Sequence, residues 1–143
     1  MKKGDNMSDL VRFSVSLEET LLQKFDKEIK KEKYPTRSKA IADLIREHLV
    51  KKEWSKDKTV VGTITLVYDH HKRELSSKVM DVQHDFHSII VSSQHVHLDH
   101  DNCLEVVIVK GKTDKIEKLA NRLKTTKGIK YATLNMASTG KEI

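Results

Sequence analysis

Two runs of strand-forming residues joined by a short polar loop constrain the fold of this chain more than any other feature. Residues 88–97 and 103–110 are rich in Val and Ile, and the loop lies between them. Such a pair predicts a β-hairpin, which brings the start of the second strand back beside the end of the first. His95 and His97 are two residues apart, so on a strand their side chains share one face. The hairpin therefore places Cys103, at the start of the second run, beside this histidine pair.

Imidazole and thiol groups in this arrangement indicate a metal site. Seven of the eight histidines fall between His70 and His100, and Cys103 is the only cysteine. Nitrogen and sulfur ligands suit a late transition metal, whereas Mg²⁺ and Ca²⁺ prefer oxygen. His84, eleven residues before His95, is a candidate fourth ligand, although a surface histidine explains that residue equally well. Solvated surface positions are the simpler interpretation of the remaining histidines of this region: His70, His71, His87 and His100. The alternative for His70, His71 and His100 is a low-affinity or transit site for metal.

Composition bounds the class of protein. The 143 residues are enough for one ordinary domain or two small ones. No apolar run approaches the roughly 20 residues of a membrane span, and the first residues lack the apolar segment of a signal peptide. A single cysteine cannot form an internal disulfide, which fits a reducing cytoplasm. The net charge of +6 permits an anionic partner, but residues 1–57 carry 14 basic and 11 acidic residues against 13 and 10 beyond, so charge alone argues weakly for nucleic acid.

The segment 10–17 alternates apolar and polar side chains, as a half-buried strand does. The apolar face holds Val11, Phe13, Val15 and Leu17, and the polar face holds Arg12, Ser14 and Ser16. Two helices are expected next. Ser16 and Glu19 form the pattern of a capping box for the first helix, and Thr36 can cap the second helix after the turn at Pro35.

A single strand in a unit of about 40 residues needs a partner, and units of that size usually need oligomerisation. A dimer that pairs the two strands as an antiparallel ribbon is the economical solution. Such a ribbon fits the DNA major groove, where Arg12, Ser14 and Ser16 can reach base edges; the simpler alternative is that these residues only face solvent. The segment resembles the ribbon-helix-helix repressors. In that class the start of the second helix holds a DNA phosphate, which here falls on Thr36, Arg37 and Ser38.

The rest of the chain predicts an α+β fold. A polar linker is expected at 52–59, which separates a ribbon-helix-helix domain at 10–51 from a second domain at 60–137. In the second domain, strand patterns fall at 60–68, 88–97, 103–110 and 129–134, with helix patterns at 71–83 and from a cap at Thr113 to near Gly128. This β-α-β-β-α-β order is the ferredoxin-like, or ACT-like, arrangement.

The two-domain order and the strings YDHHKREL, QHDF and HVHLDHDNCLE closely resemble the NikR family of nickel-responsive transcriptional regulators, over about residues 10–136. The resemblance implies one Ni²⁺ per chain, with His84 from one subunit and three ligands from its neighbour in a dimer of dimers. The full ligand set is then His84, His95, His97 and Cys103. It also implies that Gln83 and Glu105 support the ligands and that Lys72 and Arg73 contact DNA phosphates, although each of these four is also an ordinary polar surface or strand residue.

The implied function is a cytoplasmic, homotetrameric repressor of nickel uptake genes, in which nickel stabilises the DNA-binding conformation. No small organic ligand is expected. One position departs from the family, because Lys39 stands where members often carry an acidic residue. That residue, together with one matching Asp43, helps to form a second cation site, often for K⁺. Lys39 puts this site in doubt, and its ammonium group is a candidate substitute for the cation.

Three other functions compete with the repressor. A metal enzyme needs an open coordination position, which four protein ligands do not leave. A storage or delivery protein for nickel, copper or zinc gives no reason for the polar face of Arg12, Ser14 and Ser16. A small-molecule sensor is compatible with a ferredoxin-like domain, but the histidine cluster favours a metal.

Overall fold

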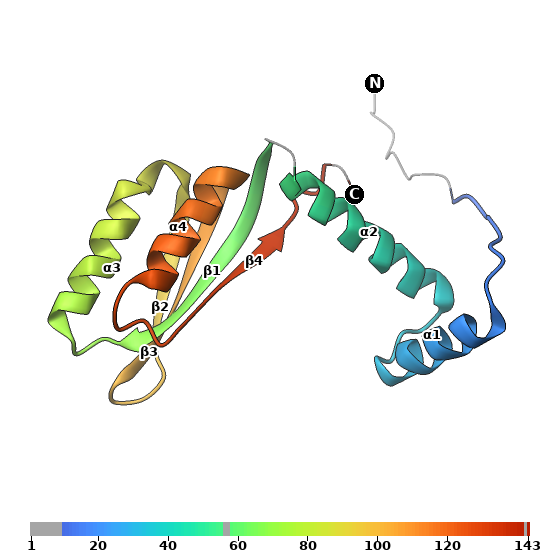
Figure 1. Cartoon of the computed structure of the whole chain (residues 1–143), viewed down its shortest axis with the longest axis horizontal. Coiled ribbons are helices and arrows are strands. Elements are labelled where there is room, and N and C mark those ends of the chain that lie inside the picture. Colours follow the sequence, from blue (N-terminus) through green and yellow to red (C-terminus); the bar gives the residue numbers. More distant parts are fainter. Residues whose placement is uncertain (1–9, 56–57, 142) are drawn as a thin grey trace, which may run out of the picture. The chain divides into compact units, whose positions relative to one another are not determined.

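The computed structural model of the chain describes residues 10–55, 58–141 and 143. They belong to two compact units, Met1–Ala42 and Asp43–Ile143. Figure 1 shows the elements along the chain. Their bounds are α1 (Glu19–Lys31), α2 (Arg37–Ser55), β1 (Thr59–Asp69), α3 (Arg73–Asp85), the 3₁₀ turn η1 (His87–Ile89), β2 (Ile90–His97), β3 (Asn102–Lys112), α4 (Thr113–Thr125) and β4 (Tyr131–Ala137). None of the described helices is long and apolar enough to cross a membrane.

The first unit holds α1 and the beginning of α2. Thr36 caps α2 as predicted, because its Oγ1 accepts a hydrogen bond from the Lys39 backbone N–H at 3.1 Å. The capping box predicted at the start of α1 is wrong. The N-cap is Glu18, without a side-chain capping bond, so Glu19 is the first helical residue and not the third, as a box opened by Ser16 requires.

The strand predicted at 10–17 is not formed by the single chain. Residues 10–18 have no strand assignment, and on the expected apolar face Val11 and Phe13 are 84% and 71% exposed. A strand needs backbone hydrogen bonds to a neighbour, and no segment among the described residues pairs with this one. The segment thus retains the alternating pattern of a strand without the partner that a strand requires.

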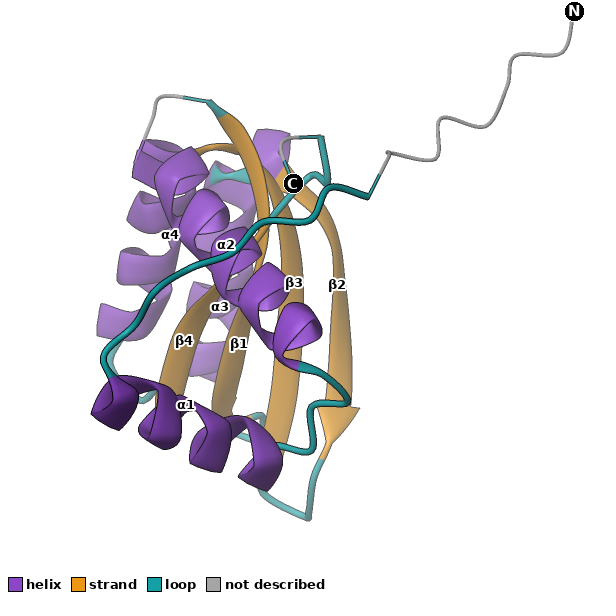
Figure 2. Ribbon diagram, turned by 90° about the vertical axis from the view of Figure 1, so that its right-hand side faces the viewer, coloured by secondary structure: helices purple, strands orange, loops and turns teal. Residues whose placement is uncertain are grey.

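The second unit confirms the predicted β-α-β-β-α-β order. Its four strands form an antiparallel sheet in the order β2-β3-β1-β4, and Figure 2 shows α3 and α4 together on one face of it. Side chains alternate between buried and half-buried along β1, because one face of the strand lies under the helices. The core between sheet and helices includes Val60, Ile64, Leu66, Leu75, Val79, Val107, Val109, Ile116, Leu119 and Leu123.

Helix α2 runs further than predicted, because it extends through Ser55 into the expected linker. Two contacts hold its end. The Trp54 indole Nε1–H donates to Ala137 O at 2.8 Å, and Ser138 Oγ donates to the Glu53 carboxylate at 3.1 and 3.2 Å. Gly62 makes room for the indole, since a Cβ there would lie 3.1 Å from the ring. Residues 56–57 of the expected linker lie outside the described residues.

Two other predicted helix starts need correction. Helix α3 begins at Arg73 and not at residue 71, because the preceding residues form a turn in which the Lys72 N–H donates to Asp69 O at 3.3 Å. Helix α4 begins at Thr113, but its N-cap is Lys112. The Thr113 hydroxyl is buried without a hydrogen-bond partner among the described atoms, so it does not cap the helix.

Candidate metal centre

The β2–β3 hairpin brings three of the four predicted ligands to one end of the sheet. His97 pairs with Cys103 across the two strands, and His95 pairs with Glu105. Side chains of residues paired in this way lie on the same face, and the ring centroids of His95 and His97 are 5.4 Å apart. The hairpin expected from the sequence is present and sets His97 opposite Cys103, but the ligand atoms of His95, His97 and Cys103 do not all lie within 4.8 Å of one another.

Cys103 is fully buried. Its thiol lies 3.4 Å from the backbone oxygen of Tyr68, to which it donates a hydrogen bond. Burial raises the pKa of the Cys103 thiol. The metal-free protein therefore holds the thiol form at neutral pH, and a metal ion that binds here must displace this proton.

Glu105 anchors a buried hydrogen-bond network beside the ligands. Its carboxylate accepts a bond from Tyr68 Oη at 2.8 Å and from Gln83 Nε2 at 2.9 Å. Burial is the largest cause that raises the pKa of Tyr68, and the hydrogen bond to Glu105 raises it further. The phenol therefore keeps its proton and remains a hydrogen-bond donor. The network joins the last turn of α3 to β1 and β3. A cavity of about 240 Å³ opens beside it, lined by Tyr68, Ser76, Val79, Met80, Gln83, Ser93, His95 and Glu105.

His84 stands apart from the other three predicted ligands. It is exposed in the last turn of α3, and its ring contacts that of His87 at 5.9 Å. Among the described residues, the ring contacts of His95 and His97 do not include His84. Within one chain, therefore, the predicted set of four is divided into three residues on the paired strands β2 and β3 and one residue on α3, and His84, His95 and His97 are all exposed.

His70, which the sequence reasoning left at the surface, belongs to the same cluster. Its ring stacks on that of His97, with centroids 4.3 Å apart and an interplanar angle of 18°. Its Nδ1 is buried without a hydrogen-bond partner in the described structure, and burial lowers the pKa of this imidazole, as do the neighbouring His71 and His97. A neutral nitrogen left unpaired beside other imidazoles fits a metal-binding environment. No local sequence signal marks His70, because the register that pairs Tyr68 with Cys103 is what brings the turn after β1 beside the end of the hairpin.

The predicted DNA contacts fall in both units. Arg12, Ser14 and Ser16 are exposed. Arg37 forms a bidentate bond to Asp26, at 2.7 and 2.6 Å, which lowers the pKa of the Asp26 carboxyl.

In the second unit, Lys72 and Arg73 line an open pocket of about 500 Å³ together with Lys78 and Lys127. This pocket is strongly basic, with Glu74 as its acidic member.

The second cation site predicted at Asp43 stays a prediction. The carboxylate accepts a bond from Arg46 at 3.1 Å, so it already has a cationic partner.

Comparison with known proteins assigns both parts of the chain. Residues 61–137 match the NikR C-terminal nickel-binding domain, and residues 11–52 match the ribbon-helix-helix proteins of the CopG family. A relative from Syntrophus aciditrophicus is 56% identical over 94% of this chain and 98% of its own length. A relative from Chlorobium limicola is 50% identical over 94% of this chain and 100% of its own length. Both carry the provisional name of nickel-responsive regulator.

A solved structure of an uncharacterized protein from Thermotoga maritima is similar in fold alone. It is 15% identical, with a TM-score of 0.52, and the match covers 57% of this chain and 100% of that one. The sequence matches are far stronger and extend over nearly the whole chain. The protein therefore belongs to the NikR family of nickel-responsive regulators, which are transcriptional regulators and not enzymes.

Proposed function

We propose that this protein is a nickel-dependent repressor of nickel uptake genes, which binds operator DNA in the cytoplasm when Ni²⁺ is bound. The observation that carries the proposal is the grouping of His95, His97 and Cys103 at the end of a hairpin, in the domain that follows a ribbon-helix-helix segment. Neutral imidazoles and a thiolate are strong donors of the kind that stabilise square-planar Ni²⁺.

The proposed ligand set is His95, His97 and Cys103 of one chain with His84 of a second copy, and it takes one nickel ion per chain. The exposed position of His84 at the end of α3 leaves it accessible to another chain. Four protein donors complete a square plane, so no coordination position is kept open for a substrate. Glu105 and Gln83 support the set by holding α3 against β3.

Two uncovered apolar surfaces support assembly into a homotetramer. The first is the alternating segment 10–17. The second is the sheet face opposite α3 and α4, where Tyr131, Ile108 and Val96 are 57%, 42% and 43% exposed. Exposed apolar surface of this kind commonly marks an interface. Pairing of the first surface produces the DNA-binding dimer, and pairing through the second unit brings His84 of one chain to the three ligands of another.

Helix α3 is the element that nickel would stabilise. Its last turn carries Gln83 and His84, and its first residue is Arg73, in the basic pocket with Lys72. An ion held by His84 fixes the end of this helix and thereby limits the positions of the two basic side chains near its start. Nickel then favours the state that binds DNA phosphates, and by linkage DNA must raise the affinity for nickel.

The ribbon supplies sequence readout in this mechanism. Arg12, Ser14 and Ser16 reach base edges, while Thr36, Arg37 and Ser38 at the start of α2 hold a phosphate. Arg37 already pairs with Asp26, so a phosphate would share or replace that carboxylate. A storage protein would need none of these contacts.

A nickel titration of the reduced full-length protein tests the proposal. We expect one Ni²⁺ per chain, a thiolate-to-nickel absorption band, and selective retention of genomic DNA fragments by the nickel-loaded protein alone. Cys103→Ser should remove the band, whereas His87→Ala, which changes an exposed histidine beside the set, should leave it intact.

The variant Arg12→Ala separates a repressor from a storage protein. It should bind nickel normally and lose selective DNA retention. Normal DNA retention in this variant would contradict readout through the ribbon, and an unchanged nickel spectrum in Cys103→Ser would contradict the ligand set.

A further inference from the structure

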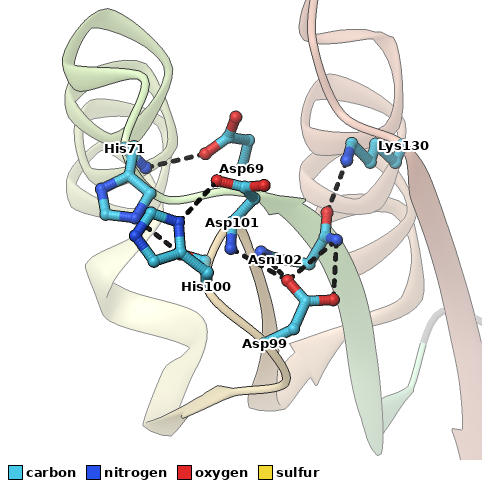
Figure 3. Close-up of polar contacts among 7 residues, drawn as sticks. All are labelled: Asp69, His71, Asp99, His100, Asp101, Asn102 and Lys130. Carbon is cyan, nitrogen blue, oxygen red and sulfur yellow. Dashed lines mark hydrogen bonds and ion pairs between the residues drawn. The ribbon is translucent and has the colours of Figure 1, made fainter.

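A second group of metal-type ligands lies outside the proposed nickel set. His71, His100 and Asp101 each offer one ligand atom, and these atoms lie within 4.8 Å of one another. This is the one such set of three among the described residues. Figure 3 shows the two imidazole rings facing each other with the Asp101 carboxylate beside them. The ring centroids are 4.9 Å apart.

Hydrogen bonds hold the two loops that carry these residues in place. The turn after β1 is fixed by a bond from the His71 N–H to Asp69 Oδ1 at 2.9 Å. The β2–β3 loop is fixed by Asp99, whose Oδ1 accepts bonds from the N–H groups of Asp101 and Asn102 at 2.9 and 2.7 Å. The loops join each other where the His70 N–H donates to Asp101 O at 3.2 Å. The three side chains thus start from a common, ordered backbone.

Both imidazoles form hydrogen bonds that a bound ion would replace. His100 Nδ1 lies 3.0 Å from Asp101 Oδ1, so an ion that binds both atoms takes the place of the hydrogen bond between them. His71 Nε2 lies 2.6 Å from His100 O, so an ion must displace that bond or bind Nδ1. Both rings are exposed and can turn at small cost.

We propose that His71, His100 and Asp101 form a second, solvent-facing site for a late first-row divalent cation such as Zn²⁺. Two nitrogens and one oxygen are a borderline donor set, which suits Zn²⁺, Ni²⁺ or Cu²⁺ better than Mg²⁺ or Ca²⁺. Ligands about 2.0–2.1 Å from a tetrahedral ion are about 3.4 Å from each other, so the separation here closes with small side-chain rotations. Water completes the coordination. The site contains no thiolate and shares no residue with the proposed nickel set, so it goes beyond the proposed function.

Sequential metal loading of the full-length protein tests the second site. The protein is first loaded with one equivalent of Ni²⁺ per chain and then dialysed against Zn²⁺, and both metals are quantified. We expect one Ni²⁺ and one Zn²⁺ per chain in the wild type. His71→Ala and His100→Ala should keep the nickel and lose the zinc, and Asp101→Asn should weaken zinc binding by roughly tenfold or more. His87→Ala is the matched control, and it should retain both metals.

Two further readouts locate the zinc ion. Its binding should shift the imidazole ¹⁵N resonances of His71 and His100, and should slow hydrogen exchange in the turn at 69–72 and the loop at 98–102. Zinc retention in both alanine variants would overturn the proposal, as would a wild type that holds nickel but no zinc. A failure of the nickel set is separately visible, because it appears as a missing thiolate band while zinc still binds.

Discussion

The two units of this protein differ in where the partners of their apolar residues come from. In the second unit, helices α3 and α4 cover one face of a four-stranded sheet, and Ile116, Leu119 and Leu123 are completely buried within the chain. In the first unit, α1 has no buried residue, and Val11, Phe13 and Val15 are more than half exposed. The second unit thus carries its own core, whereas the first unit leaves the apolar residues of the segment 10–17 exposed within the single chain. The dimer that we propose would cover these residues with those of a second copy.

Truncation of a core residue should give the largest effect. Leu119 is fully buried and Leu21 is 52% exposed. Leu119→Ala should lower the unfolding free energy of the second unit by about 3 kcal/mol, because it leaves a cavity. In dilute protein, Leu21→Ala should lower the unfolding free energy by less than about 0.5 kcal/mol. Urea unfolding followed by circular dichroism measures both, and equal losses would abolish the distinction between the units.

Removal of an apolar side chain from the segment 10–17 should weaken assembly and not the second unit. Phe13→Ser loses about 2 kcal/mol of burial per copy, so dimerisation through the first unit should weaken by more than tenfold. The urea midpoint of the second unit should stay unchanged. Analytical ultracentrifugation provides the test, with Ser14→Ala on the opposite face as the control. If Phe13→Ser dimerises as tightly as the wild type, the segment 10–17 is not part of the dimer interface.

Alkaline pH should destabilise only the second unit of the metal-free protein. Burial raises the pKa of Cys103 above its usual value. A group with a raised folded-state pKa contributes stability that is complete below its unfolded-state pKa, about 8.5 for a thiol, and that is lost as pH rises toward the folded-state pKa. The urea concentration at the unfolding midpoint should therefore decrease as pH rises above that value. The initial part of this decrease should be smaller in Cys103→Ser than in the wild type. A midpoint that stays constant through this range would show that the thiol titrates normally.

The smallest effect concerns two exposed carboxylates, one in each unit. Bonds from the Asn102 side chain and from the backbone N–H groups of the same loop lower the pKa of Asp99 to about 2 from 3.8. Its contribution is present above about pH 4 and is lost as pH falls through about 2. Asp99→Asn should reduce the acid sensitivity of the thermal midpoint of the second unit, whereas Asp26→Asn should not alter that midpoint. If Asp99→Asn and the wild type respond identically to acid, the Asp99 carboxylate does not contribute to the acid sensitivity of the second unit.

The order of elements could be predicted from the sequence because it rests on local periodicity. The hairpin that carries His95, His97 and Cys103 follows from two strand patterns and a short loop. The strand at 10–17 has an equally clear pattern, but pairing depends on a partner, which local sequence does not supply. The helix starts were less predictable, because Ser16 with Glu19 satisfies the capping pattern while the chain begins its helix later.

The clusters around the candidate site depend on distant contacts. His71 and His100 are 29 residues apart, and only the juxtaposition of two turns brings their rings together. His70 joins the ligand cluster through the register of β1 and β3. None of these three histidines has a local signature that separates it from a solvated surface residue, so the sequence alone favoured surface positions for all three.

The end of α2 gives this protein a built-in optical probe. Trp54 is the only tryptophan of the chain, it is 5% exposed, and its indole donates to Ala137 O. Indole emission shifts to longer wavelength when the ring enters water, so the fluorescence of the whole protein reports one contact, between α2 and the β1–β4 edge of the sheet. Detachment of that helix end can be followed in real time, without a dye and without altering a residue.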